Sequence, residues 1–188
     1  LMDALALQEQ AKYRRFRALE RKNVTSPGRV LAPRAWRILG KPTSGSLIDY
    51  GCGECAAVDW FRSKGLEAVG VDLVAVREDV VEACLWDMGA EVPASDWAFS
   101  SDVLEHLPED KVPAALAGIR DRTRRLGVLQ IATRPDNSGR LIGETLHLTV
   151  RPAEWWAEML ADHWPVVHTL KTPKDWQSLF VVGGEALI

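Results

Sequence analysis

The sequence predicts an α/β fold in which a doubly wound, mostly parallel sheet lies between two layers of helices. Three observations predict this class. From residue 45 onward, short apolar strand signals alternate with longer helical patterns, which is typical of a parallel sheet with helices on both faces. The first strand signal, 46–50, runs directly into a glycine-rich turn, and the second, 68–72, ends on an acidic residue. Open α/β sheets bind their ligands at strand ends of this kind.

The first 44 residues are predicted to form a helical arm, and residues 45–188 a single domain. Residues 3–22 have the composition of a polar, basic helix, which the Ser-Pro-Gly stretch within 23–28 would end. Residues 32–39 fit a second, short helix. We expect the arm to cover the substrate.

Basic residues are concentrated in this arm. Nine of them lie between Lys12 and Arg37, against one acidic residue, Glu20, although the chain has a formal net charge of −3. Such a patch indicates an anionic partner, such as a nucleic acid, or an anionic substrate. A solvated helix face followed by a loop is the alternative interpretation.

Within the domain, short apolar runs bounded by turn residues predict strands, and longer amphipathic segments predict helices. The polar segment 133–147 follows the fifth strand, and loops of that length are usually lids or binding loops. The predicted strands are 46–50, 68–72, 81–85, 97–101, 127–132, 166–170 and 179–182. The predicted helices are 54–64, 74–79, 109–124 and 152–162.

Composition narrows the class of protein. Apolar residues make up 47% of the chain, enough for a substantial core, yet no apolar run approaches the roughly 20 residues that span a bilayer. The start of the chain is too acidic and too short in apolar residues for a secretion signal. The three cysteines, Cys52, Cys55 and Cys84, are too few for a disulfide framework, and a single C-x-x-C pair does not make a structural zinc site. We therefore expect a cytoplasmic enzyme.

The turn after the first strand has the residues of a ligand cradle. Gly51 and Gly53 let the backbone turn sharply and approach a ligand closely, and the helix that follows directs free N–H groups toward it. Asp72 ends the second strand, 23 positions beyond Asp49. An acidic residue at about that distance is suited to bind the hydroxyl pair of a ribose.

The stretch 100–108, Ser-Ser-Asp-Val-Leu-Glu-His-Leu-Pro, has the side chains of a catalytic or ligand-binding site. If the chain turns helical after a strand near 97–100, Asp102, Glu105 and His106 stand at i, i+3 and i+4 and share one face. Two carboxylates and an imidazole on one face can bind a divalent cation, hold a cofactor amine or share a proton.

These segments, 49–55, 67–73 and 100–108, resemble the motifs of class I S-adenosylmethionine-dependent methyltransferases. The stretch Asp-Val-Leu-Glu-His is most similar to that of the ubiquinone-biosynthesis O-methyltransferase-like subgroup, and the resemblance covers roughly residues 45–185. It implies a Rossmann-like sheet of seven strands that closes with a C-terminal antiparallel hairpin. It also implies S-adenosylmethionine as cofactor and methyl transfer to a hydroxyl, or less readily an amine, of a small molecule or glycan.

The resemblance assigns a donor site to the ends of the first four strands. The glycine turn would hold the methionine end, Asp72 the ribose, and the residues after the third strand the adenine. The third glycine common in this turn is Cys55 here, whose side chain is expected to narrow the pocket wall. The implied cofactor-binding residues are Asp49, Gly51, Cys52, Gly53, Asp72, Leu73, Trp86, Asp87 and Asp102.

The resemblance also extends to a metal site. In several members of that subgroup, and in small-RNA 3′-terminal 2′-O-methyltransferases, an acid-x-x-Glu-His segment and a distant histidine bind magnesium. The corresponding ligands here are Asp102, Glu105, His106 and His147. Two imidazoles would also suit manganese, zinc or iron, and a hydroxyl bound to such a cation loses its proton readily.

Two other roles stay open for this cluster. Without metal, His106 or His147 is a candidate general base, because an unperturbed histidine titrates near pH 6.5. Alternatively, Glu105 and His106 only brace the start of a helix, and Asp102 only bonds to backbone amides. The catalytic candidates are therefore His106, His147 and Asp102.

The substrate side of the pocket is expected to include the long loop, where Arg134 and Arg140 are candidates for binding a carboxylate or phosphate. Two alternatives to a small-molecule or glycan acceptor are kept. One is a nucleic-acid 2′-O-type methyltransferase, suggested by the basic arm, and the other is a domain that binds S-adenosylmethionine without catalysis.

Overall fold

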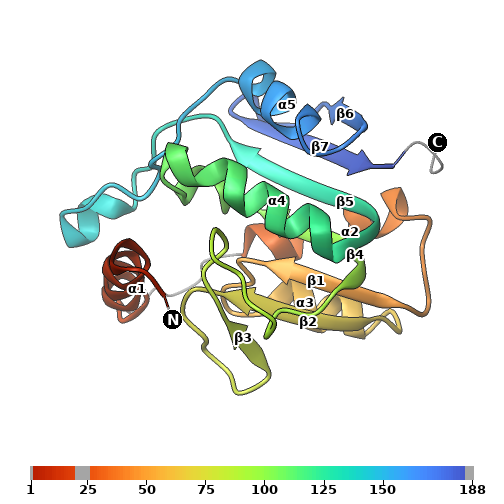
Figure 1. Ribbon diagram of the computed structural model, residues 1–188, viewed down its shortest axis with the longest axis horizontal. Helices are drawn as coiled ribbons and strands as arrows, with labels where there is room; N and C mark the ends of the chain where they lie inside the picture. The colour runs from red at the N-terminus through yellow and green to blue at the C-terminus, as the bar shows by residue number, and fades with distance from the viewer. Residues whose placement is uncertain (1, 20–25, 185–188) are drawn as a thin grey trace.

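The computed structural model describes residues 2–19 and 26–184, and within them the chain forms one seven-stranded sheet with helices on both faces (Figure 1). The strand order is β3-β2-β1-β4-β5-β7-β6. Strands β1 to β5 are parallel, and β7 runs antiparallel to both β5 and β6. The predicted fold class, with its C-terminal antiparallel hairpin, is confirmed. The strands are β1 Ser46–Tyr50, β2 Glu67–Asp72, β3 Val80–Glu82, β4 Ser95–Ser101, β5 Thr123–Ala132, β6 Val166–Leu170 and β7 Gln177–Gly183.

Two hydrophobic cores fill the space between the sheet and its helices. One face carries α2 (Pro27–Ile38) and α3 (Ala56–Arg62), whose buried side chains pack with those of the central strands. The other face carries α4 (Val112–Arg122) and α5 (Ala153–Ala161). The strands between these layers are almost entirely buried, as expected for a parallel sheet covered on both faces.

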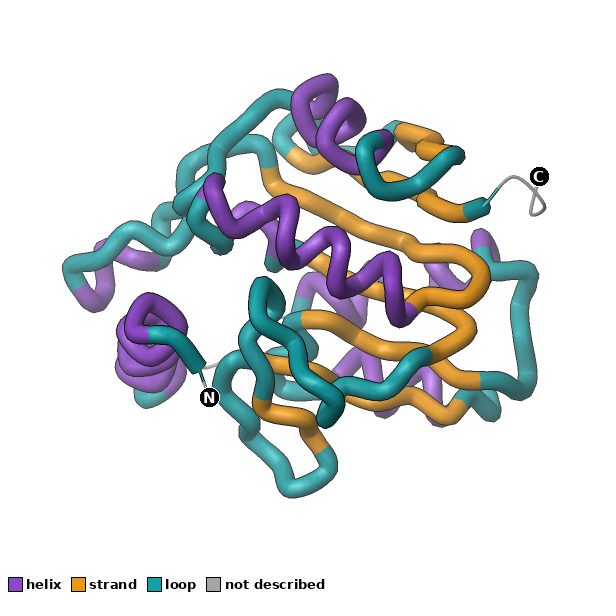
Figure 2. Tube along the Cα trace, in the orientation of Figure 1, coloured by secondary structure: helices purple, strands orange, loops and turns teal. Residues whose placement is uncertain are grey.

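The remaining helix, α1 (Ala4–Arg17), lies outside these layers at the carboxyl edge of the sheet (Figure 1). Asp3 caps it by accepting a hydrogen bond from Ala6 N at 2.7 Å, and three arginines in its last turn suit the helix dipole. Figure 2 shows that loops gather around this edge, including the segment that carries the short 3-10 helix η3 (Gly139–Ile142). None of the described helices is long and apolar enough to cross a membrane.

Several element boundaries differ from the prediction. Helix α1 begins one residue later than the predicted 3–22 and ends earlier, at Arg17; residues 20–22 of the prediction lie outside the described part of the chain. Helix α2 begins at Pro27, five residues before the predicted start, because Ser26 caps it and a proline is well suited to the first helical position.

The predicted helix 74–79 does not form. Side chains instead tie the segment to its neighbours: Asp72 accepts from Val74 N at 3.0 Å, and Glu82, at the end of β3, accepts from Ala75 N at 3.1 Å. The Arg77 guanidinium pairs with Asp59 of α3 and with Asp79. The segment is therefore a series of turns between β2 and β3.

Candidate functional site

A cavity of about 170 Å³ lies at the carboxyl edge of the sheet. The strand order changes direction there, between β1 and β4, and open α/β sheets bind ligands at such a point. Seven residues that the sequence predicted for the site line the cavity: Gly51, Gly53, Asp72, Leu73, Trp86, Asp102 and His106. Helix α1 forms part of its wall with Glu9, Tyr13 and Arg17.

The other predicted site residues do not line this cavity. Asp49 and Cys52 are buried in or just after β1, and Asp87 lies in the turn that follows β3. The remaining ones belong to the neighbouring histidine cluster or to the long loop: Glu105, Arg134, Arg140 and His147.

The glycine turn has the geometry that its sequence predicts. Gly51 and Gly53 have φ angles of +77° and +54°, a conformation that residues with a Cβ rarely adopt. A side chain at position 51 would also collide with Val103, which lines the cavity. The backbone N–H of Gly51 donates to Val71 O at 2.7 Å, which ties the turn to β2.

Cys55, at the place of the missing third glycine, does not narrow the cavity, so that expectation is wrong. Its side chain is fully buried and points to Cys52, with the two Sγ atoms 3.6 Å apart. Cys55 has a left-handed φ of +62° and directly precedes α3. Burial raises the pKa of both thiols, which disfavours a reactive thiolate.

Asp72 is held firmly at the end of β2. One carboxylate oxygen accepts from Gly53 N at 2.9 Å, and the other accepts from Val74 N at 3.0 Å. The guanidinium of Arg17, from α1, lies 2.8 Å from the same carboxylate. The glycine turn, the end of β2 and α1 therefore meet on one acidic side chain.

The acid of the first strand has a different environment. Asp49 is 3% exposed, and burial, with the nearby Asp72, raises its pKa to about 8. This carboxyl group therefore retains its proton at neutral pH in the ligand-free protein.

Trp86 lines the cavity from the turn after β3. Its indole N–H donates to Asp3, the residue that caps α1, at 3.3 Å. The start of the arm thus contacts the residue that the sequence predicted for the adenine pocket.

The chain does not become α-helical directly after β4, so the predicted helical face of Asp102, Glu105 and His106 is wrong. Asp102 has a left-handed φ of +56°, and only the single 3-10 turn Leu104–His106 follows it. Asp102 therefore does not share a helical face with the other two residues.

The Asp102 carboxylate is bound by side chains of the sheet. It accepts from Gln130 Nε2 at 2.9 Å, from Gln177 Nε2 at 2.8 Å and from Ser101 Oγ at 3.0 Å. Asp102 is not part of the histidine cluster described next, although the resemblance had implied it as a fourth ligand.

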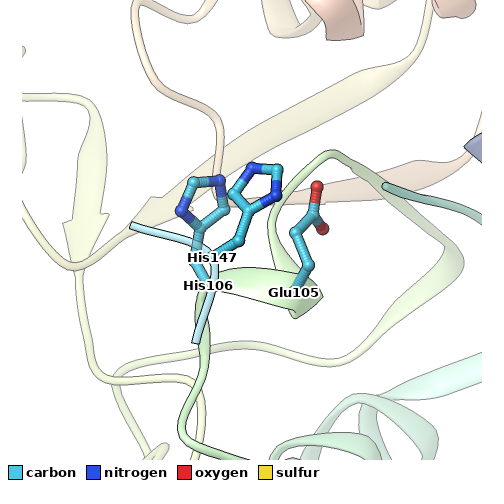
Figure 3. A group of neighbouring side chains, drawn as sticks. All are labelled: Glu105, His106 and His147. Carbon is cyan, nitrogen blue, oxygen red and sulfur yellow. The ribbon is translucent and has the colours of Figure 1, made fainter. Parts of the chain in front are cut away.

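Glu105, His106 and His147 come together beside the cavity, with one ligand atom from each within 4.8 Å of the others (Figure 3). The two imidazole rings meet edge to face, with centroids 4.7 Å apart. Glu105 is fully buried, and one of its oxygens accepts from Ala132 N at 3.1 Å. The other, Oε2, has no hydrogen-bond partner among the described residues. Burial, with the nearby Asp102, raises the pKa of Glu105 well above its usual range.

Backbone carbonyls fix the tautomers of both histidines. His147 Nδ1 lies 2.6 Å from Arg134 O, and His106 Nδ1 lies 3.1 Å from Leu146 O. A carbonyl oxygen only accepts, so each Nδ1 carries a proton, and in a neutral ring with that proton the lone pair is on Nε2. Burial, followed by the proximity of His147, lowers the pKa of His106 to about 3. The cluster thus offers imidazole nitrogens and an oxygen of the Glu105 carboxyl group, which has to lose its proton to bind a cation.

The two predicted substrate arginines lie on the long loop. The Arg134 guanidinium stacks on the Trp176 ring, 3.5 Å from its centroid, and Lys174 lies 4.5 Å from the same centroid. Arg140 is exposed on η3. Arg134 is connected to the cluster through its carbonyl, which binds His147.

The contribution of α1 was not predicted residue by residue. Glu9, Tyr13 and Arg17 follow one another at intervals of four, which places them on one side of a helix. That spacing was visible in the sequence, but a polar stripe more often faces solvent, so it gave no reason to assign them to the site.

Residues 13–180 match a family model described as a methyltransferase domain. No curated protein matches the chain. Among solved structures, the chain is similar to the 1,6-didemethyltoxoflavin-N1-methyltransferase of Burkholderia thailandensis with bound 1,6-didemethyltoxoflavin and S-adenosylhomocysteine. The TM-score is 0.67 and the identity 16%, over 96% of this chain and 87% of that one.

Two further structures share the fold. Magnesium protoporphyrin IX methyltransferase from Synechocystis PCC 6803, with bound S-adenosylhomocysteine, has a TM-score of 0.62 and 14% identity over 95% of this chain and 94% of that one. The small RNA methyltransferase HEN1 has a TM-score of 0.65 and 11% identity over 88% of this chain and 27% of that one. Because the family match spans most of the sequence and the ligand cavity lies at the sheet edge of the shared fold, the chain belongs to the methyltransferase-domain family and is a class I S-adenosylmethionine-dependent methyltransferase.

Proposed function

We propose that this enzyme methylates a hydroxyl oxygen of a small molecule or glycan, and that Glu105, His106 and His147 hold a divalent cation beside the donor. The single observation that carries the proposal is the histidine cluster: the fully buried Glu105, whose Oε2 has no partner among the described residues, has a ligand atom within 4.8 Å of one from each of two imidazoles. The similarity of the 102–106 stretch to the ubiquinone-biosynthesis O-methyltransferase-like subgroup agrees with this.

The cavity residues fit the donor. Asp72 has its carboxylate fixed by two backbone N–H groups at the cavity wall, where it is suited to accept from both ribose hydroxyls. Gly51 and Gly53 leave the methionine end free of side chains, and the Trp86 ring is available to the adenine. S-adenosylmethionine supplies a methyl group on a sulfonium, whose transfer depends mainly on in-line positioning of the acceptor.

The ligand set of the cluster fits a cation better than it fits general base catalysis. A pKa of about 3 makes His106 a weak base at neutral pH, whereas a neutral imidazole is the form that coordinates a metal. Two imidazoles with one carboxylate favour iron, manganese or zinc over magnesium. A divalent cation would lower the pKa of a bound acceptor hydroxyl and so provide the nucleophile.

The acceptor is expected to approach from the side of the long loop. Arg134 and Arg140 have no carboxylate partner among the described residues, and Arg134 is stacked on Trp176 next to His147. A planar acceptor could stack on the Trp176 ring there, and the two arginines could bind its carboxylate or phosphate group.

Metal dependence is the direct test. We expect enzyme treated with a chelator to lose at least about 90% of its transfer of labelled methyl to a panel of phenols and sugars, and to regain it with Mn²⁺, Fe²⁺ or Zn²⁺. Glu105→Gln and His147→Ala should reproduce the loss, whereas His168→Ala, on the exposed side of β6, should not. Full activity after chelation would contradict the metal site, and transfer to amines alone would contradict the hydroxyl acceptor.

Nucleic acid is the second candidate acceptor, and the basic arm is the observation that favours it. Several of its charges are already used within the chain: Arg14 pairs with Glu82, Arg15 with Glu144 and Arg17 with Asp72. If RNA is the acceptor, binding should weaken steeply between about 50 and 200 mM salt, measured by fluorescence anisotropy of a labelled oligonucleotide. Absence of binding at the lowest salt would rule this candidate out.

A further inference from the structure

Helix α1 is a wall of the active site as well as part of the arm. Its residues Glu9, Tyr13 and Arg17, four positions apart, face the cavity. Ala6 is its only buried apolar residue, and its other buried residues are polar. A helix that docks through polar groups gains little from apolar burial, so its polar contacts have to define its position.

The contacts of α1 extend from the donor end of the site to the histidine cluster. At one end Arg17 binds the Asp72 carboxylate and donates to Val74 O at 2.6 Å. One helical turn earlier, the Tyr13 hydroxyl lies 2.6 Å from His106 Nδ1. The same helix therefore contacts both the residue proposed for the ribose and one of the proposed metal ligands.

The hydrogen bond between Tyr13 and His106 has a definite direction. Leu146 O lies 3.1 Å from the same Nδ1 and can only accept, so the proton is on Nδ1. If the tyrosine donated instead, Nδ1 would direct a lone pair at the carbonyl oxygen. The Nδ1–H group of His106 therefore donates to two acceptors, the Tyr13 hydroxyl oxygen and Leu146 O. The Nε2 atom of the neutral ring then carries no proton.

We propose that Tyr13 is a positioning residue of the methyltransferase: its oxygen, with Leu146 O, locks His106 in the Nδ1–H tautomer and turns Nε2 toward Glu105 and His147. The proposal rests on the function proposed for His106. Partners of this kind behind a coordinating imidazole fix its tautomer and orientation.

The surroundings of Tyr13 are built to keep it in place. Lys12 donates to Thr145 O at 3.2 Å, and Arg15 pairs with Glu144, so α1 is joined to the segment that leads into His147. The Tyr13 ring also packs edge to face on the His106 ring, with centroids 5.8 Å apart. A phenylalanine at position 13 would keep this packing and remove only the oxygen.

The test compares the two tyrosines of the chain. In Tyr13→Phe we expect kcat and Mn²⁺ affinity each to fall about tenfold or more, with the KM for S-adenosylmethionine changed less than about twofold. Tyr50→Phe is the matched control, because the buried Tyr50 hydroxyl has no partner among the described residues and lies outside the cavity wall. It should leave all three quantities unchanged.

A second measurement does not depend on a variant. The ¹⁵N chemical shifts of the His106 ring in the parent enzyme should report the Nδ1–H tautomer. In Tyr13→Phe, where Leu146 O is the only one of the two acceptors left, they should show a larger share of the Nε2–H tautomer than in the parent. An Nε2–H tautomer in the parent, or a variant with parental kcat and Mn²⁺ affinity, would overturn the proposal. If no metal binds the parent but Tyr13→Phe still lowers kcat and shifts the tautomer, the metal site fails and the role of Tyr13 stands.

Discussion

Three acidic residues at the ends of neighbouring strands have different surroundings, and these decide what each can do. Asp72 accepts from backbone N–H groups at the cavity wall and pairs with Arg17. Asp102 is bound by two glutamine amides and a serine, which fixes its carboxylate beside the cavity. Asp49 is buried, and burial gives it a proton at neutral pH.

Asp49 gives the protein a specific dependence of stability on pH. The pKa of Asp49 is about 8 in the folded protein, whereas an aspartate in an unfolded chain has its ordinary pKa of 3.8. Between these two pH values the folded state therefore holds a proton that the unfolded state has lost. The free energy of unfolding should therefore fall as the pH rises from about 4 to about 8, by roughly 2–5 kcal/mol.

The replacement Asp49→Asn should remove this contribution to the pH dependence of stability, because asparagine does not ionise. Urea unfolding of the ligand-free protein at pH 5.5, 7 and 8.5 should show a smaller loss of stability with pH in the variant than in the parent. Parallel curves for the two proteins would show that Asp49 is ionised over the whole range. Asp87→Asn, at a turn residue outside the cavity wall, provides a control for the loss of a carboxyl group.

At the scale of elements, α1 differs from the four helices that cover the sheet. Those helices bury apolar side chains in the two cores, whereas α1 contacts the domain mainly through hydrogen bonds and ion pairs. Helices held in this way open locally at a lower free energy than the core does. Opening of α1 would also provide a path into the cavity that it covers.

The cap of α1 should control this opening. Asp3 accepts from Ala6 N at 2.7 Å and from the Trp86 indole at 3.3 Å. We expect Asp3→Ala to cost about 1 kcal/mol and to raise amide hydrogen exchange in α1 roughly fivefold. Exchange in β1 and β4 should not change.

Asp3→Asn is the matched variant, because asparagine caps helices as well as aspartate does. Its exchange should resemble that of the parent. Equal exchange in the alanine variant would mean that the arginine and lysine contacts alone hold the helix.

For the whole molecule, the prediction succeeded where the pattern along the chain is local. The strand signals and the glycine turn gave the class of fold, because alternating strands and helices have few ways to bury their apolar faces. The prediction failed at 74–79 and after Asp102, where side-chain contacts with neighbouring elements and a left-handed residue override helical propensity.

The pairing within the site is a long-range property. His147 lies 41 positions beyond His106, and only the path of the loop between β5 and α5 brings their rings together. Tyr13 reaches His106 from 93 positions away. No spacing rule in the sequence encodes contacts of this kind, because they depend on how separately formed elements pack.

The order of residues was therefore sufficient for the α/β class, the glycine turn after the first strand and the acid at the end of the second strand, since each follows from short-range sterics and hydrogen bonding. The folded chain alone decided that Asp102 leaves the histidine cluster, that Cys55 turns away from the cavity and that α1 supplies Tyr13 and Arg17. These outcomes depend on burial and on partners distant in sequence, which local patterns do not specify.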